Sequence, residues 1–199
     1  MSDIISICNS ALFKIGANQI MALTDGTKEA NACSIRYEDC KRAVLRSHPW
    51  SCATKRVILS PDTVQPAFGY TYAFQLPADF LRVIKVNPET QDDYKIDGTK
   101  LLGDFTELQL KYIYDVADAS QFDSLLVEAI ACYLAWDISY NITQSFQVKD
   151  MMNKDKDKAL SKAKLADSQQ MPSPEVEANE FLDARLGPVA SNITQRRNW

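Results

Sequence analysis

The 199-residue chain is poor in the residue types on which the commonest active sites depend, since it contains one histidine and six glycines. One histidine is too few for a zinc site built from several imidazoles, and His48 is the single imidazole available to a Ser-His-Asp site. His48 precedes Pro49 at the end of a predicted helix, where we expect it to pack or to cap the helix. Neither of two common glycine-rich phosphate-binding patterns, GxGxxG and GxxxxGK followed by Ser or Thr, occurs. These absences predict a protein that is not an enzyme and that has no metal or cofactor site.

The chain also lacks an excess of basic residues, a long apolar run and closely paired cysteines. Its net charge of −4 argues against a surface built to bind DNA phosphates. The longest apolar stretch, around 125–136, is interrupted by Glu128 and followed by Asp137, and no leader-like segment is seen at the start. The five cysteines form no CxxC pair, which is typical of buried free thiols. We therefore expect a soluble protein, made in the cytoplasm, without membrane contacts.

Apolar residues make up 46% of the chain, which is enough for a packed core, and four segments show helical spacing. These segments are 3–15, 28–47, 122–143 and 147–169. The third is apolar on nearly every side, so we expect it to be buried, either centrally or between subunits. The fourth alternates in charge over 154–158, which is typical of a solvated helix face.

Ion pairs are expected along the fourth segment at helical spacing. Asp150 precedes Lys154 by four residues, and Asp155 precedes Lys158 by three. Such pairs stabilise a helix by only about 0.2–0.5 kcal/mol each. They indicate an exposed surface and no binding role.

The middle of the chain changes to a period of two, which predicts strands. Strands are expected at 55–60, 70–76, 81–86 and 108–114, with a hairpin over 93–102 that turns at Asp97-Gly98. Strand alternation places four aromatic residues on one sheet face, namely Phe68, Tyr70, Tyr72 and Phe74. This face is expected to pack either on the core or on another subunit, since Tyr and Phe are enriched in interfaces.

After Pro172 the chain becomes acidic and rich in Asn, Gln, Gly and Pro, with scattered apolar residues. Such a segment cannot bury enough apolar surface to fold alone, and we expect it to order against a partner. Six of its residues are candidates for that contact: Phe181, Leu182, Arg185, Leu186, Ile193 and Trp199.

Together these patterns predict an α+β fold: an antiparallel bundle of about four helices with an inserted small antiparallel β subdomain and an extended C-terminal arm. The bundle takes 1–52 and 119–171, the β subdomain 53–118, and the arm 172–199.

Four segments occur in an order that resembles a known family. The first helix ends in ALFKIG (11–16), the second closes on LRSHPW (45–50), and LPADFLRV (76–83) precedes a hairpin through 96–98. In this order they resemble the tail tubular protein A family and related head-to-tail adaptors of tailed phages. The resemblance covers roughly the first half of the chain.

The resemblance implies a virion protein that forms a ring, usually of twelve subunits, beneath the portal. It implies that the helical bundle builds the ring, that the arm docks on the portal protein, and that the β part faces the next tail or nozzle protein. DNA then passes through the enclosed channel without specific binding, and an acidic lumen would let it slide because no counterions are released. A ring subunit needs two different contact faces, which suits the apolar third helix and the aromatic strand face.

Three alternatives remain open from the sequence. The chain could be a neck or head-completion protein of a long-tailed phage, or a plug at the tail end. It could be a small lysis or nuclease enzyme, whose activity would have to depend on His48. It could also be a regulator that binds DNA through a helical pair, although its acidic charge and the lack of a basic helix argue against this.

Overall fold

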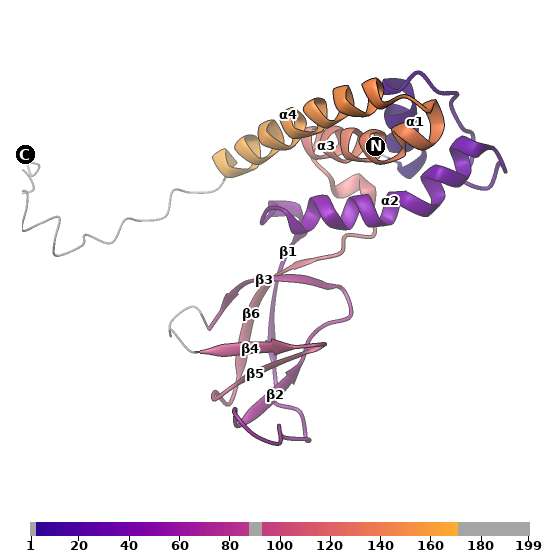
Figure 1. Ribbon diagram of the computed structural model, residues 1–199. Helices are drawn as coiled ribbons and strands as arrows, with labels where there is room; N and C mark the ends of the chain where they lie inside the picture. The colour runs from indigo at the N-terminus through magenta and orange to yellow at the C-terminus, as the bar shows by residue number, and fades with distance from the viewer. Residues whose placement is uncertain (1–2, 88–92, 171–199) are drawn as a thin grey trace, which may run out of the picture. The chain divides into compact units, whose positions relative to one another are not determined.

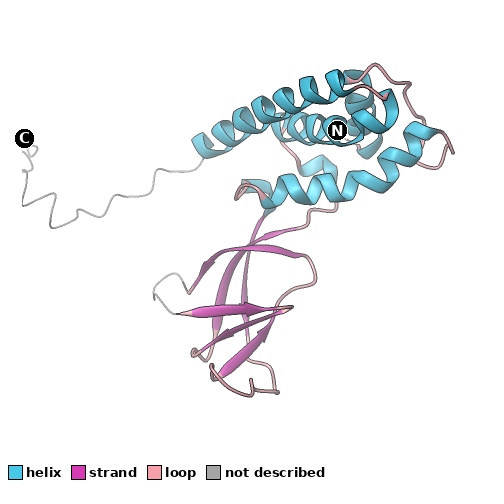
Figure 2. Ribbon diagram, viewed as in Figure 1, coloured by secondary structure: helices cyan, strands magenta, loops and turns pink. Residues whose placement is uncertain are grey.

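Two helices precede the strands along the chain and two follow them, as Figures 1 and 2 show. The computed structural model describes residues 3–87 and 93–170. The helices are α1 (Ile4–Lys14), α2 (Lys28–Arg46), α3 (Ser124–Thr143) and α4 (Phe146–Gln170). The strands are β1 (Thr54–Leu59), β2 (Tyr72–Gln75), β3 (Phe80–Val86), β4 (Tyr94–Asp97), β5 (Lys100–Gly103) and β6 (Leu108–Tyr114). The predicted α+β class, with a β part inserted into a helical bundle, is confirmed.

Local sequence signals set where the first two helices begin and end. Asp3 caps α1 by accepting a hydrogen bond from the Ile4 amide at 2.7 Å, and Thr27 caps α2 through the Ala30 amide at 3.1 Å. Gly16 follows α1 with a φ of 71°, a backbone conformation that glycine adopts without strain. These caps satisfy amides that have no partner inside the helix.

Helix α3 is the centre of the helical core, and it packs against α1 and α2. Among the described helices it is the one long and apolar enough to cross a membrane by length and composition, a test that core helices also pass, and half of that segment is buried. Its two acids face neighbouring helices, with Lys14 at 2.5 Å from Glu128 and Arg36 at 2.6 Å from Asp137. The predicted packing of this helix at the centre of the bundle is observed.

Some charged residues of α4 are exposed to solvent, and others contact α3. The predicted pair of Asp150 and Lys154 forms at 2.9 Å, whereas Asp155 and Lys158 form no ion pair within 3–87 and 93–170. Lys156 lies 4.2 Å from the centre of the Trp136 ring on α3. The alternating segment is therefore not wholly a solvated face, because one of its lysines lies against an aromatic side chain.

Two three-stranded antiparallel sheets make up the β part, in the orders β1-β6-β3 and β2-β5-β4. The predicted hairpin is confirmed: Asp97 pairs with Lys100, and Gly98 between them has a φ of 61°. The two sheets enclose a second hydrophobic cluster, separate from the helical one, that includes Phe74, Leu101 and Leu110. Ile113, by contrast, belongs to the helical core, so β6 contributes to both clusters.

Ion pairs connect α2 to the end of β6. Lys41 is 3% exposed, and its Nζ lies 3.0 Å from Asp115 and 2.7 Å from Glu38. The Arg42 guanidinium also contacts Asp115, at 2.7 Å. A buried cation is tolerated only when it is paired, so Asp115 fixes the direction in which the chain leaves β6.

Replacement of Tyr37 by phenylalanine is expected to raise the free energy of unfolding by about 1 kcal/mol, because a buried hydroxyl without a partner costs its desolvation. Tyr37 is 3% exposed, and its hydroxyl has no hydrogen-bond partner in the described part of the chain. Urea unfolding measures the change. The matched control is Tyr112→Phe, which removes a hydroxyl that donates to Asp79 at 3.0 Å and is expected to destabilise by about the same amount. If both variants lowered the free energy of unfolding equally, the Tyr37 hydroxyl would not be without a hydrogen-bond partner.

The thiols are free and mostly buried, as predicted, and they make stability sensitive to alkaline pH. Burial raises the pKa of Cys40 to about 12 and that of Cys132 to about 11, from the ordinary value of 9.0. Between pH 9 and pH 11 the unfolded chain loses these protons while the folded chain keeps them, so stability falls as pH rises through this window. The urea midpoint should therefore decrease above pH 9, and less steeply in a Cys40→Ala/Cys132→Ala variant. If the urea midpoint of the variant decreased with pH as steeply as that of the parent, the two thiols would not be the cause.

Candidate docking surfaces

The six residues of the predicted portal-docking arm lie outside the described residues. They are Phe181, Leu182, Arg185, Leu186, Ile193 and Trp199. That contact stays a prediction.

The predicted aromatic strand face is smaller than the sequence suggested. Strand β2 begins at Tyr72, so Phe68 and Tyr70 precede it, and Gly69 between them has a φ of 93° that interrupts an extended chain. Phe74 is 0% exposed and stacks on Phe105 inside the sheets' own core, with Tyr72 packed at its edge. Phe68, at 88% exposed, is the member most open to another subunit. The four side chains therefore form no common face, because the glycine ends the alternation.

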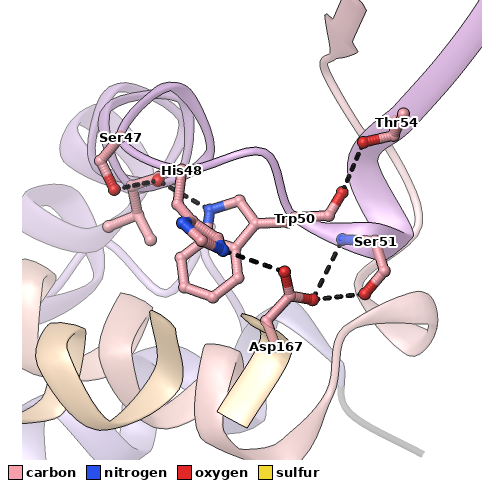
Figure 3. A network of polar contacts seen from close by, with 7 residues as sticks. Ser47, His48, Trp50, Ser51, Thr54 and Asp167 are labelled. Atoms are coloured by element: carbon pink, nitrogen blue, oxygen red, sulfur yellow. Dashed lines mark hydrogen bonds and ion pairs between the residues drawn. The ribbon is translucent and has the colours of Figure 1, made fainter. Parts of the chain in front are cut away.

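The only histidine takes part in a polar network that joins α4 to the start of β1 (Figure 3). The Asp167 carboxylate lies 3.0 Å from His48 Nε2 and accepts from the Ser51 amide at 3.0 Å and from the Ser51 hydroxyl. Trp50 packs edge-on against the His48 ring and donates from Nε1 to the Val44 carbonyl at 3.0 Å. The network thus connects the end of α2 and the segment just before β1 to α4.

This network is not arranged for nucleophilic catalysis. A serine nucleophile needs a hydrogen bond to the base that takes its proton. Here Ser51 and His48 both face Asp167, and no contact joins the serine to the imidazole. This geometry fits the expected packing role of His48. In addition, the Asp167 carboxylate connects α4 to His48 and Ser51.

The LPADFLRV segment forms the turn into β3 and is tied to both neighbouring strands. Asp79 accepts from Lys55 of β1 at 2.6 Å and from the Tyr112 hydroxyl of β6 at 3.0 Å. Burial alone would raise the pKa of Asp79, but the hydrogen bonds from Lys55 and Tyr112 outweigh it and the pKa is lowered. The carboxylate is therefore ionised at neutral pH and joins three strands at one end of the β1-β6-β3 sheet.

A row of cations crosses the outer face of this sheet, and sequence inspection did not identify it. Arg56 of β1 lies directly opposite Lys111 of β6, and Lys111 lies opposite Lys85 of β3. None of the three makes an ion pair with a described residue. With Ile58 and Gln109 they line a groove of about 660 Å³, hereafter the cationic groove. The signal in the sequence is one cation on each of three strands, but only the strand pairing brings them together.

Exposed apolar side chains occur on several helices. Phe13 on α1 is 75% exposed and Ile35 on α2 is 70% exposed. On α4, Phe146 and Leu165 are also exposed. Single apolar residues are common on protein surfaces, and those on separate helices supply separate potential contacts.

Comparison with protein-family models gives no match for this chain. Comparison with curated proteins gives no match either. Within 3–87 and 93–170, no group of three or more His, Cys, Asp or Glu side chains is placed to hold a metal ion. The candidate surfaces are thus the cationic groove and the exposed apolar residues of the helices, together with the arm beyond the described residues.

Proposed function

We propose that this chain is a structural subunit of a phage virion, a ring-forming adaptor between the portal and the tail that encloses the DNA exit channel. The proposal rests on the family resemblance of the first half of the chain. Its main structural support is the position of the segments that carry the resemblance. LRSHPW and LPADFLRV lie at the junction between the helical bundle and the β part.

Each of these segments has a physical task at that junction. Trp50 is 2% exposed and closes the helical core where the chain enters β1. Asp79 joins β3 to β1 and β6 through two side-chain hydrogen bonds. The motifs therefore specify how a β insert is attached to a helical bundle, which is the plan that the resemblance implies.

The surface supports ring formation in general terms. A closed ring requires a subunit with two different contact faces. Exposed Phe13 and Ile35 belong to α1 and α2, whereas exposed Phe146 and Leu165 belong to α4. We propose that such helical residues meet in the ring and that the arm after residue 171 docks on the portal protein.

Electron microscopy of the purified full-length chain, with and without the portal protein of the same phage, tests the proposal. The expected result is a ring seated on the portal, with twelve copies as the family resemblance implies. The same chain mixed with tail tube alone is the control, and it separates an adaptor from a neck or tail-end protein. A monomer in every mixture, without portal binding, would overturn the adaptor proposal.

A further inference from the structure

The lysines and arginines of the β part fall into two groups according to the sheet face on which they lie. Lys55, Lys95 and Lys100 each lie within 3.4 Å of a carboxylate. The others form no ion pair within 3–87 and 93–170, and they are Arg56, Arg82, Lys85 and Lys111. Strand partners share a face, and the register pairs these four residues with one another or with Ile113, which is two residues from Lys111 on β6. The unpaired cations of the β part are therefore gathered on one face of the β1-β6-β3 sheet.

Positive charge on this face is not explained by the sheet itself. Arg56 and Lys85 both lie opposite Lys111, and like charges opposite one another destabilise a sheet. Charged residues on edge strands can prevent unwanted strand pairing, which accounts for Arg56 on β1 and Lys85 on β3. Lys111 lies on the central strand β6, where no such reason applies. Its position between two other cations points to an anionic ligand.

The lining of the cationic groove restricts the kind of anion. Apart from the three cations it is lined by Val57, Ile58, Gln109 and Leu110, so no acidic and no aromatic side chain of the described chain contributes. Sites for single-stranded nucleic acid depend on aromatic side chains that stack on bases. A surface with cations of one sign and no stacking partner fits instead the backbone of a duplex, whose bases are already stacked on one another.

The length of the cation row matches a short stretch of DNA backbone. Arg56 and Lys85 are separated by two strand spacings, or about 10 Å, with Lys111 between them. Each strand of a DNA duplex carries one phosphate per about 3.4 Å of helix axis. The row therefore spans about three phosphates of one strand, and it offers one cation for each.

The acidic helix surfaces of a second copy fit the groove less well. Ile35 shares a face of α2 with Glu38 and Asp39, and Phe146 shares a face of α4 with Asp150, so each surface combines acids with an exposed apolar residue. Each of these three acids already pairs with a cation of its own helix. Docking them on the groove would exchange one ion pair for another, whereas DNA phosphates carry no competing side chain.

We propose that the cationic groove binds the phosphate backbone of duplex DNA without regard to base sequence. Arg56, Lys85 and Lys111 pair with phosphates of one strand, and the exposed Ile58 beside them contacts a deoxyribose. The net charge of −4 argues against phosphate binding over the whole surface, and the proposed contact is confined to this one face. The inference goes beyond the adaptor proposal and does not depend on it, because it concerns the purified chain without the portal protein.

Fluorescence anisotropy of a labelled DNA duplex, titrated with the full-length chain at several salt concentrations, tests the proposal. Neutralising three phosphates should make the logarithm of the binding constant fall with the logarithm of salt concentration at a slope of about −2.7. Arg56→Gln/Lys111→Gln removes two of the three contacts, so the slope should change to about −0.9 and binding at low salt should weaken at least tenfold. Two duplexes of unrelated sequence should bind equally, because phosphates carry no sequence information.

The matched control is Lys95→Gln/Lys158→Gln, which changes the net charge equally at exposed lysines of β4 and α4. It should bind the duplex as the parent does. Urea unfolding checks the fold of both variants. The groove variant is expected to have a urea midpoint at or above that of the parent, because it removes the opposition of Lys111 to Arg56 and Lys85.

Three results would overturn the proposal. The first is an absence of duplex binding by the parent at low salt. The second is equal binding by the parent, the groove variant and the control, which would place any DNA contact elsewhere. The third is tighter binding of poly-L-glutamate than of the duplex, lost in the groove variant, which would assign the groove to an acidic protein surface. The electron microscopy test with the portal protein is separate, so either proposal can fail without the other.

Discussion

Replacement of Trp50 by alanine is expected to lower the free energy of unfolding by about 3–5 kcal/mol, the usual cost of truncating a buried tryptophan. The indole is 2% exposed in the helical core. Its Nε1 donates to the Val44 carbonyl at the end of α2, and its ring packs against His48. The substitution leaves a cavity and an unpaired carbonyl at the point where the bundle meets the β part. Urea unfolding followed by far-ultraviolet circular dichroism measures the loss.

Trp136→Ala is the matched control for this prediction. Trp136 is only partly buried and contacts Lys156, so its loss is expected to cost about 1–2 kcal/mol. Trp50→Phe separates packing from hydrogen bonding, since it keeps most of the apolar volume and loses the bond to Val44, for about 1 kcal/mol. Should Trp50→Ala cost no more than Trp136→Ala, the junction would not depend on the HPW segment.

The helices were predictable because their signals are local. Caps such as Thr27, the glycine after α1 and the apolar residues of α3 lie within a few turns of the helix that they specify. The central position of α3 was not decided by the sequence, since an apolar helix fits a core and an interface equally well. The structure shows the core packing, with α3 against α1 and α2.

The strands were predicted from the sequence, but their pairing was not, apart from the 93–102 hairpin. Alternation predicts that Leu108 and Leu110 face one side, but it does not predict that β6 lies between β1 and β3. The error at Phe68 and Tyr70 has a local cause, because Gly69 adopts a positive φ that a strand pattern cannot include.

The cationic groove could not be predicted for the same reason, because it depends on the strand pairing. Arg56, Lys85 and Lys111 are separated by up to 55 positions along the chain, and each alone is an ordinary exposed strand residue. The strand register places them side by side. His48 could be interpreted from sequence because its helix end is local, whereas its contact with Asp167 joins residues 119 positions apart.

Removal of the arm after Gln170 is expected to abolish portal binding while leaving the fold intact. This prediction follows from the proposed adaptor function. Residues 1–169 form one compact unit, so truncation removes no core residue of that unit. Loss of two anchoring side chains at about 1.4 kcal/mol each would already weaken binding about 100-fold. Portal affinity measured by surface plasmon resonance, and thermal unfolding measured in parallel, separate loss of docking from loss of folding. A truncated chain that binds the portal as the parent does would exclude the arm as the docking element.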